Sequence, residues 1–490
     1  MLTYSFENRD TKSLYQYLYK CIKNDILKGI LPTDYKLPSK RAFAKHLNIS
    51  TITVENAYYN LLSEGYIYSI PKKGYYVAKI NNIFKTTDIN NNNSNEDNND
   101  VSNIIHSINN AYKISLKDDN IKTYKANFNS NQTNPDNFPF SIWAKLLRNV
   151  INNQRSELMI SSPYGGIKEL REAISNHVYN YRGISVSPEQ IIIGAGTEYL
   201  YGLLIQLLGR DKIYAVEDPG YKKISKIYSR NNVNVKYIPL TNKGISVDKL
   251  YNFQADILHI SPSHHFPTGI ITPISTRYKL LEWANTASTK YIIEDDYDSE
   301  FRFNGKPIPS LQSIDTNEKV IYINTFSKSL ASTIRISYMI LPKHLLYKFK
   351  KELSFYSCTV STFEQYTLAK FINDGYFEKH INRMRIYYKN LRNSILNEIK
   401  NSPINSQVKI TEMNSGLHFL MKVINGLDDK TIQKRADRLD INLAFMSEFY
   451  NTPNNEKHLH PTLVINYSGI KPELVKSYIN LLCNCIIKDE

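Results

Sequence analysis

Lys328 is the residue whose setting points most directly to chemistry. It ends the motif Thr325-Phe326-Ser327-Lys328, which follows an apolar, β-branched run, and Arg335 comes seven residues later. A lysine at the rim of a sheet forms an imine with an aldehyde cofactor when its surroundings lower its pKa. Arg335, together with the Thr325 and Ser327 hydroxyls, is suited to hold a phosphate nearby. A Ser-Lys pair alone is weak evidence, so the prediction depends on the motifs that accompany it.

An acidic motif, Glu294-Asp295-Asp296-Tyr297, follows another β-branched run. A carboxylate here is suited to pair with a protonated pyridine nitrogen, the partner that pyridoxal phosphate uses when it acts as an electron sink. The tyrosine two residues later is suited to donate to the hydroxyl oxygen of the same ring. A surface acidic loop is the ordinary alternative for this motif taken alone.

Three further segments end predicted strands with groups that suit a flat, phosphorylated ligand. Residues 194–198, Gly-Ala-Gly-Thr-Glu, join a strand to a helix whose N-terminus favours an anion. Residues 217–221 end in Tyr221, whose ring is suited to stack on a planar cofactor. In residues 261–269, His264 and His265 fit a structural role better than a catalytic one.

These motifs need a scaffold that brings strand ends together. Short β-branched runs alternate with helical periods along the body of the chain, which predicts an α/β fold with an open, mainly parallel sheet. Ligands of such sheets bind outside the carboxyl ends of the strands, and the polar motifs fall there. The predicted strands are 191–193, 212–216, 257–260, 291–293 and 320–323.

The first 80 residues carry a different pattern, a helix-turn-helix followed by a hairpin. Ser39 and Ser50 suit the N-termini of two successive helices, the second of which covers 51–63. A hairpin over 67–77 with a basic tip follows, and such a tip suits phosphate contacts. The residues predicted to contact DNA are Ser39, Lys40, Arg41, Thr51, Ile52, Thr53, Lys72, Lys73 and Gly74.

Charge is consistent with this interpretation but does not establish it. The chain has a net charge of +15, and its first 80 residues hold twelve basic residues against six acidic ones. A composition bias of the whole genome, or a small helical scaffold with a solvated basic face, explains the same numbers. The sequence shows no apolar run long enough to cross a bilayer and no export signal, and its four cysteines are scattered, so we expect no metal site and a cytoplasmic protein.

The chain divides at an asparagine-rich tract that includes residues 90–93. Such a polar tract buries too little apolar area to offset its ordering entropy, so it predicts a flexible linker. The predicted domains are a DNA-binding head at 1–80, a linker at 81–115 and a ligand-binding body at 116–490.

The two domains together resemble one known group of proteins. The head resembles the GntR family of winged-helix regulators through L-P-S-K-R, A-x-x-L-x-I-S and K-x-G-Y-Y-V. The body resembles fold-type-I aminotransferases through T-F-S-K-S-L, I-E-D-D-Y-D-S-E-F-R and E-D-P-G-Y. The fusion is similar to the MocR/GabR group, although Thr51 stands where GntR proteins usually have a basic residue.

The resemblance implies roles for individual residues and partners. It implies pyridoxal 5'-phosphate held as an internal aldimine by Lys328, with Asp295 on the pyridine nitrogen, Tyr297 on the ring hydroxyl and Tyr221 against the ring. It also implies a homodimer on double-stranded operator DNA, in which Tyr164 reaches the cofactor of the partner subunit. The other implied cofactor-binding residues are Gly196, Thr197, Glu198, Thr325, Ser327 and Arg335.

Two functions fit this combination, a transcription regulator that senses a small amine or amino acid and a working aminotransferase with a DNA-binding head. Such enzymes hold the substrate carboxylate with an arginine near the C-terminal end, yet the last arginine here is Arg438 and Val464 stands near the expected place. GabR-like regulators use an arginine for effector binding where this chain has Lys223. We therefore predict a regulator in which an effector amine displaces Lys328 from the cofactor and forms an external aldimine with it. Pyridoxal phosphate itself is a further candidate signal.

Overall fold

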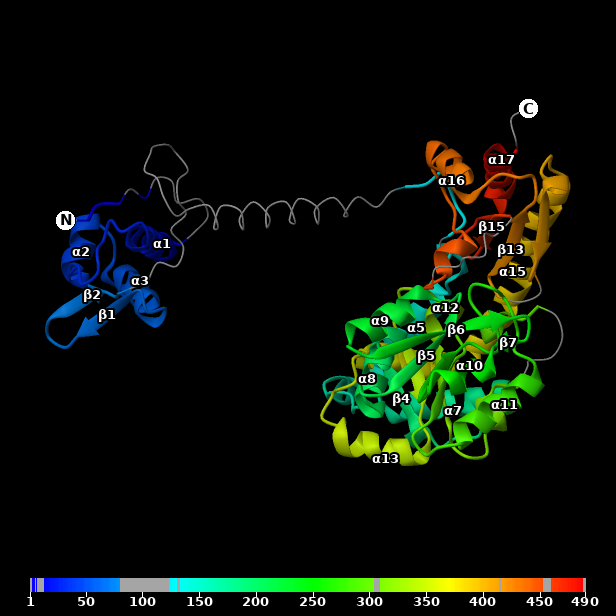
Figure 1. Ribbon diagram of the computed structural model, residues 1–490. Helices are drawn as coiled ribbons and strands as arrows, with labels where there is room; N and C mark the ends of the chain where they lie inside the picture. Colours follow the sequence, from blue (N-terminus) through cyan, green and yellow to red (C-terminus); the bar gives the residue numbers. More distant parts are fainter. Residues whose placement is uncertain are drawn as a thin grey trace, which may run out of the picture. The chain divides into compact units, whose positions relative to one another are not determined.

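The structure is a computed structural model that describes residues 2–4, 6, 13–79, 123–129, 133–303, 309–413, 416–452 and 460–487. The chain divides into two compact units, Met1–Asp119 and Asn120–Glu490 (Figure 1). The linker predicted at 81–115 lies outside the described residues. Among the described residues, no helix has both the length and the apolarity needed to cross a bilayer.

The first unit is a three-helix winged fold around its own apolar core. The predicted caps are confirmed, because Ser39 accepts from the Ala42 amide and Ser50 accepts from the Thr53 amide. Helices α1 and α2 pack on α3, and an antiparallel hairpin completes the unit (Figure 1). Its elements are α1 (Leu14–Leu27), α2 (Lys40–Leu47), α3 (Thr51–Ser63), β1 (Ile67–Ile70) and β2 (Gly74–Val77).

An eight-stranded, mainly parallel sheet forms the centre of the second unit, in the order β4-β11-β10-β9-β8-β5-β6-β7. The predicted parallel sheet is confirmed, with β11 and the short β7 as its antiparallel members. Strands β5, β9 and β10 each extend two residues beyond the predicted end, so the polar motifs begin inside the sheet. The strands are β4 (Ile191–Gly194), β5 (Ile213–Asp218), β6 (Asn234–Thr241), β7 (Gly244–Ile245), β8 (Ile257–Ile260), β9 (Tyr291–Asp295), β10 (Val320–Thr325) and β11 (Ser337–Ile340).

Helices cover both faces of this sheet, which explains why its strands are apolar on both sides. Ile192 and Ile293 face the cluster that contains α8 and α13, whereas Ile193 and Tyr338 face the cluster that contains α7 and α14. The helices of this layer are α5 (Phe140–Asn153), α6 (Arg155–Leu158), α7 (Lys168–Arg182), α8 (Thr197–Leu208), α9 (Lys222–Arg230), α10 (Val247–Asn252), α11 (Ile274–Asn285), α12 (Phe326–Ser329), α13 (Lys343–Glu352) and α14 (Thr362–Asn373).

The C-terminal part of the second unit packs around a separate apolar cluster that includes Phe419 and Ile465. A three-stranded antiparallel sheet in the order β12-β13-β15 lies at its centre, and β3 pairs with β14 beside it. The elements are β3 (Ala126–Asn127), α15 (Tyr376–Lys400), β12 (Val408–Thr411), β13 (His418–Val423), α16 (Asp429–Arg438), β14 (Ile441–Asn442), β15 (Thr462–Asn466) and α17 (Val475–Ile486).

Candidate functional site

The exposed face of the head is the candidate DNA interface. Ile52 lies at the N-terminal end of α3 and is 68% exposed, although it is apolar. An apolar side chain on a recognition helix is suited to contact the methyl group of thymine, so its exposure fits a role in reading bases. The predicted contact residues that are exposed are Ser39, Arg41, Thr51, Ile52, Lys72 and Lys73.

The other predicted DNA contacts, Lys40, Thr53 and Gly74, have structural roles within the head. The Lys40 ammonium pairs with the Glu55 carboxylate, which joins the start of α2 to α3. The Thr53 hydroxyl lies 2.8 Å from the Ser50 Oγ, within the cap of α3. Gly74 begins β2 with a φ of 115°, a conformation that glycine adopts readily. These three residues therefore shape the interface, and direct contact with DNA remains a prediction for all nine residues.

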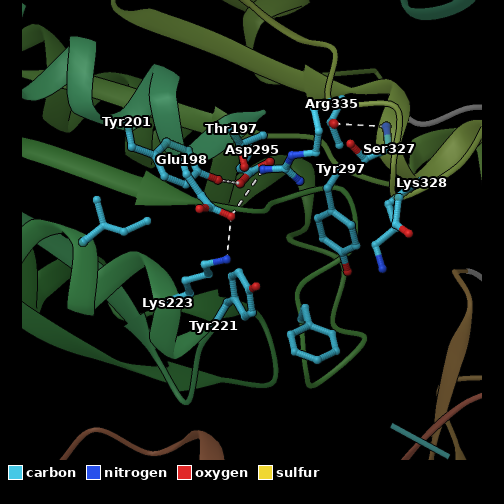
Figure 2. Close-up of a pocket in the computed structure, with 14 residues that line it drawn as sticks. Thr197, Glu198, Tyr201, Tyr221, Lys223, Asp295, Tyr297, Ser327, Lys328 and Arg335 are labelled. Atoms are coloured by element: carbon cyan, nitrogen blue, oxygen red, sulfur yellow. Dashed lines mark hydrogen bonds and ion pairs between the residues drawn. The ribbon is translucent and has the colours of Figure 1, made fainter. Parts of the chain in front are cut away.

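One pocket in the body gathers most of the residues predicted to hold a cofactor (Figure 2). Its volume is about 210 Å³. Strands β4, β5, β9 and β10 run in the same direction, so the segments that follow them meet at one edge of the sheet. The predicted residues that line the pocket are Thr197, Glu198, Tyr221, Lys223, Asp295, Tyr297, Thr325, Ser327, Lys328 and Arg335.

Lys328 lies on α12, the single turn of helix that follows β10, and its side chain reaches the pocket (Figure 2). Burial lowers the pKa of its ammonium group from about 10.5 to about 8, and the nearby Asp298 carboxylate opposes part of this effect. A neutral amine is the nucleophilic form of lysine. The site therefore gives Lys328 the property that an imine-forming lysine needs near neutral pH.

The Asp295 carboxylate faces the pocket from the end of β9. The Tyr201 hydroxyl donates to its Oδ2 at 2.5 Å, and His259 Nε2 lies 3.6 Å from the same oxygen. Its Oδ1 is buried and has no hydrogen-bond partner among the described residues. A buried carboxylate oxygen without a donor is costly, and a protonated ring nitrogen satisfies it. The pyridine ring of pyridoxal phosphate therefore fits this site.

Tyr297 lies between Asp295 and Lys328 along the pocket wall (Figure 2). Burial and the neighbouring carboxylates raise the pKa of its hydroxyl well above the ordinary value, so the group stays protonated and remains a donor. Its oxygen lies 3.3 Å from Nδ1 of His264, and that nitrogen lies 2.8 Å from Oδ2 of Asp298. Both contacts fall on the same nitrogen, and Nε2 of His264 is buried without a partner among the described residues, so the structural role of His264 stays a prediction.

One corner of the pocket is formed by the N-terminus of α8 and by Arg335. Gly196 precedes α8 with a φ of 91°, and a Cβ atom placed on it lies 2.4 Å from Arg335 Nη2. Glycine therefore lets the guanidinium lie against the backbone at the positive end of a helix. Thr197, the first residue of α8, also lines the pocket. This corner is suited to a phosphate.

Replacing Gly196 by alanine is expected to weaken pyridoxal-phosphate binding by about tenfold to a hundredfold. The methyl group displaces Arg335, and loss of a charge-assisted bond costs about 1.5–3 kcal/mol. Fluorescence titration of the purified variant with the cofactor measures this change. Gly202→Ala is the matched control, because a Cβ atom at this α8 position meets no atom within 4 Å. An unchanged dissociation constant for Gly196→Ala contradicts the assigned corner.

The Thr325 and Ser327 hydroxyls already have partners in the turn that carries Lys328. The Ser327 hydroxyl donates to the Ile334 carbonyl at 2.8 Å, and the Ser327 amide donates to Thr325 Oγ1 at 3.1 Å. Ser337 adds a further contact, with its hydroxyl 2.7 Å from Thr325 Oγ1. These bonds hold the turn in place. Direct contact of either hydroxyl with a phosphate remains a prediction.

Glu198 bridges the two basic residues at the mouth of the pocket (Figure 2). Its Oε1 lies 2.5 Å from Lys223 Nζ and 3.5 Å from Arg335 Nη2. The hydrogen bond from Lys223 lowers the pKa of this carboxyl group, with a smaller contribution from Arg335. The predicted effector-binding lysine is therefore paired with an anion of the chain itself.

A buried ion pair holds the acidic motif at residues 294–297 in place. Arg182, the last residue of α7, lies 2.9 Å from the Asp296 carboxylate through Nη2, and both side chains are buried. The Tyr322 hydroxyl donates to the same carboxylate at 2.6 Å. Glu294 accepts the amides of the 311–312 turn. The motif is thus a buried strand end, and the alternative of a surface acidic loop is wrong.

One predicted residue, Tyr164, lies outside the pocket, and several residues that were not predicted line it or contact its carboxylate. Tyr164 does not line this pocket, and its ring packs against Phe349 instead. Sequence reasoning missed Tyr201, although it follows Thr197 by four residues and thus lies on the same face of α8. His259 was also missed, because nothing in a buried β8 strand distinguishes it. Besides Tyr201, the missed residues that line the pocket are Ile227, Phe266 and Ser332.

Comparisons with known proteins agree with this geometry. Residues 123–482 match the family described as Aminotransferase class I and II, and residues 14–77 match Bacterial regulatory proteins, gntR family. The chain is 36% identical over 471 residues to the uncharacterized HTH-type transcriptional regulator YdeL of Bacillus subtilis, covering 96% of each protein. It is 28% identical over 483 residues to the probable rhizopine catabolism regulatory protein MocR of Rhizobium meliloti, covering 96% of this chain and 93% of that protein.

Among solved structures, a kynurenine aminotransferase from Pyrococcus horikoshii matches with a TM-score of 0.64 at 23% identity. The match covers 80% of this chain and 95% of the other. The body therefore has the fold of an aminotransferase, joined to a helix-turn-helix head.

Proposed function

Because this chain belongs to the MocR/GabR group of GntR-type regulators, it is a pyridoxal-phosphate-dependent, DNA-binding transcription regulator, and we propose that its body senses a small primary amine. The observation that carries the proposal is the buried Lys328 amine with its lowered pKa, in a pocket that is also lined by Asp295, whose buried Oδ1 has no hydrogen-bond partner among the described residues. Operator DNA lies in the cytoplasm, which is the compartment that we propose for the protein.

We propose that different pocket residues bind different parts of the cofactor. When bound, pyridoxal phosphate supplies an aldehyde carbon that exchanges one primary amine for another. Lys328 is the amine of the chain that would hold this carbon and that an effector amine would replace. Asp295 would keep the ring nitrogen protonated, Tyr297 would donate to the ring hydroxyl, and Tyr221 would pack against the ring. Arg335 and the N-terminus of α8 would hold the phosphate.

Release of Lys328 is the event that we propose to couple to DNA binding. An effector shifts a two-state protein only through contacts that differ between the states, and the affinities for effector and DNA then change reciprocally. We further propose a homodimer, which presents two heads to repeated or palindromic half-sites. We propose that in such a dimer Tyr164, which does not line the pocket of its own chain, approaches the pocket of the partner subunit.

A mobility-shift assay on the DNA upstream of the protein's own gene tests the proposal. Full-length protein is titrated alone, with pyridoxal phosphate, and with pyridoxal phosphate plus a panel of small amines. We expect an amine to change the apparent DNA affinity by at least fivefold, within the ordinary range of coupling energies. A response to the cofactor alone, with no amine effect, identifies pyridoxal phosphate itself as the signal and contradicts amine sensing.

The control for DNA binding replaces Lys72 and Lys73 by glutamine. These exposed residues form the tip of the hairpin, and loss of two phosphate contacts is expected to reduce the slope of log affinity against log salt by about two. The matched double substitution of Lys350 and Lys351 on α13 removes the same charge from an exposed part of the body and is expected to leave the slope unchanged.

A working aminotransferase is the second candidate, because a buried lysine with a lowered pKa is also the proton carrier that transamination needs. The surroundings of Val464 argue against this function. Val464 stands near the place expected for the carboxylate-binding arginine, and it is a buried member of an apolar cluster. Lys223 opposes it as well, because its ammonium is paired with Glu198. Steady production of a keto acid from an amino donor and an acceptor, sustained over many turnovers, favours the enzyme.

A further inference from the structure

The wall of the pocket beside Tyr221 is aromatic and apolar. Phe266 lines the pocket, and its ring contacts those of Tyr221, Phe449 and His418 at centroid distances of 6.0, 5.2 and 5.2 Å. Behind Phe266 lies an apolar cluster whose buried members are Ala444, Met446 and Val464. An apolar wall of this kind favours an apolar part of a ligand and offers nothing to a charged one.

The basic residues of the same pocket already have anionic or cofactor partners. Among the described residues that line it, the cationic side chains are Lys223, Lys328 and Arg335. Lys223 lies 2.5 Å from Glu198, and Arg335 contacts the same carboxylate at 3.5 Å while facing the phosphate corner. Lys328 holds the aldehyde carbon in the proposed function.

Glu198 adds a repulsive element to this arrangement. Its lowered pKa keeps the carboxylate charged at neutral pH, at the mouth of the pocket. A carboxylate of a ligand that approaches Lys223 must therefore lie beside a like charge and compete for the same ammonium. Specificity of binding sites often rests on such a repulsive group as well as on attractive ones.

We infer that the effector is a small primary amine with an apolar body and no carboxylate, and that Glu198 excludes amino acids by occupying Lys223. This inference rests on the proposed function, because it takes the cofactor pocket to be the effector site. It assigns to Glu198 a role in specificity, in addition to its place beside the cofactor.

Two matched pairs of ligands test the inference, each differing by a methyl group in place of a carboxylate. The pairs are n-butylamine against γ-aminobutyrate, and isopropylamine against L-alanine. Full-length protein loaded with pyridoxal phosphate is titrated with each ligand, and binding is followed by calorimetry and by the visible absorbance of the bound cofactor. Each dissociation constant is divided by that for free pyridoxal phosphate in the same buffer, which removes differences in the reactivity of the amines.

We expect the amine without a carboxylate to bind at least tenfold more tightly in each pair. In Glu198→Gln, which releases Lys223, this preference is expected to fall at least fivefold. Glu172→Gln is the matched control, because it removes a similarly exposed carboxylate that pairs with Lys168 on α7, and it is expected to keep the preference.

The possible outcomes distinguish failure of this inference from failure of the proposed amine sensing. Equal or tighter binding of γ-aminobutyrate and L-alanine overturns the inference and leaves amine sensing intact. An unchanged preference in Glu198→Gln removes the role of Glu198. Failure of all four ligands to bind or to change the absorbance, in protein that carries the cofactor, overturns amine sensing itself.

Discussion

Replacing Lys328 by alanine is expected to abolish the covalent link to pyridoxal phosphate. Protein mixed with the cofactor and reduced with borohydride is expected to carry one phosphopyridoxyl group at Lys328, detected by peptide mass spectrometry. The Lys328→Ala variant is expected to carry none at this position. The visible absorbance of the bound cofactor is expected to disappear in the same variant. The physical reason is that Lys328 has its amine in the pocket with a pKa near 8.

The rate at which pyridoxal phosphate attaches to Lys328 is expected to increase with pH. Burial lowers the pKa of Lys328 to about 8, so the reactive neutral amine predominates above that pH and falls about tenfold for each unit below it. We therefore expect the rate of cofactor attachment to rise from about pH 6.5 to about pH 8 and to level off above that range. An attachment rate that keeps rising to about pH 10 indicates an ordinary exposed lysine and contradicts the assignment.

The matched control for Lys328→Ala is Lys350→Ala, which removes an exposed lysine from α13. It is expected to retain both the absorbance and the phosphopyridoxyl group at Lys328. A melting curve of each variant separates loss of chemistry from loss of folding. If Lys328→Ala stays coloured after dialysis and another lysine carries the group, the imine role belongs to that other residue.

Arg182→Met is expected to destabilise the body more than removal of any exposed ion pair would. It leaves the Asp296 carboxylate, whose side chain is 2% exposed, without its cationic partner. Breaking a buried ion pair by removing one member costs about 3–5 kcal/mol, because the remaining charge stays buried. The free energy of unfolding of the body, from urea titration followed by fluorescence, measures the loss.

Arg182 also matters for the pocket, because Asp296 stands between Asp295 and Tyr297 in the chain. Arg182→Met is therefore expected to weaken pyridoxal-phosphate binding in the protein that remains folded. Adding Asp296→Asn removes the unpaired charge, and the double variant is expected to recover at least half of the lost stability. No recovery in the double variant means that the charge of Asp296 is not the cause. The exposed Arg148→Met on α5 serves as control, with a change below about 0.5 kcal/mol.

Local patterns in the sequence were sufficient to predict the class of fold and the parts of the site. Apolar β-branched runs separated by helical periods predicted the parallel sheet, because strands buried on both faces have no polar side. The caps at Ser39 and Ser50 were predictable for a similar reason, since they depend on atoms only three residues away. Lys328, Asp295 and Tyr221 were predicted as site residues because each follows or ends a predicted strand, and strand ends converge at one edge of a parallel sheet.

Only the tertiary structure decided which partners these residues meet. Tyr201 and His259 contact Asp295 across gaps of 94 and 36 residues, and no local pattern encodes such contacts. The pairing of Lys223 with Glu198 likewise depends on how α8 and α9 lie in space. The sequence by itself determined the chemical groups and the edge of the sheet that carries them, because both follow from neighbours along the chain. Which oxygen of Asp295 is left unsatisfied, and which cation is already neutralised, depends on packing between distant segments, and so only the folded chain decides it.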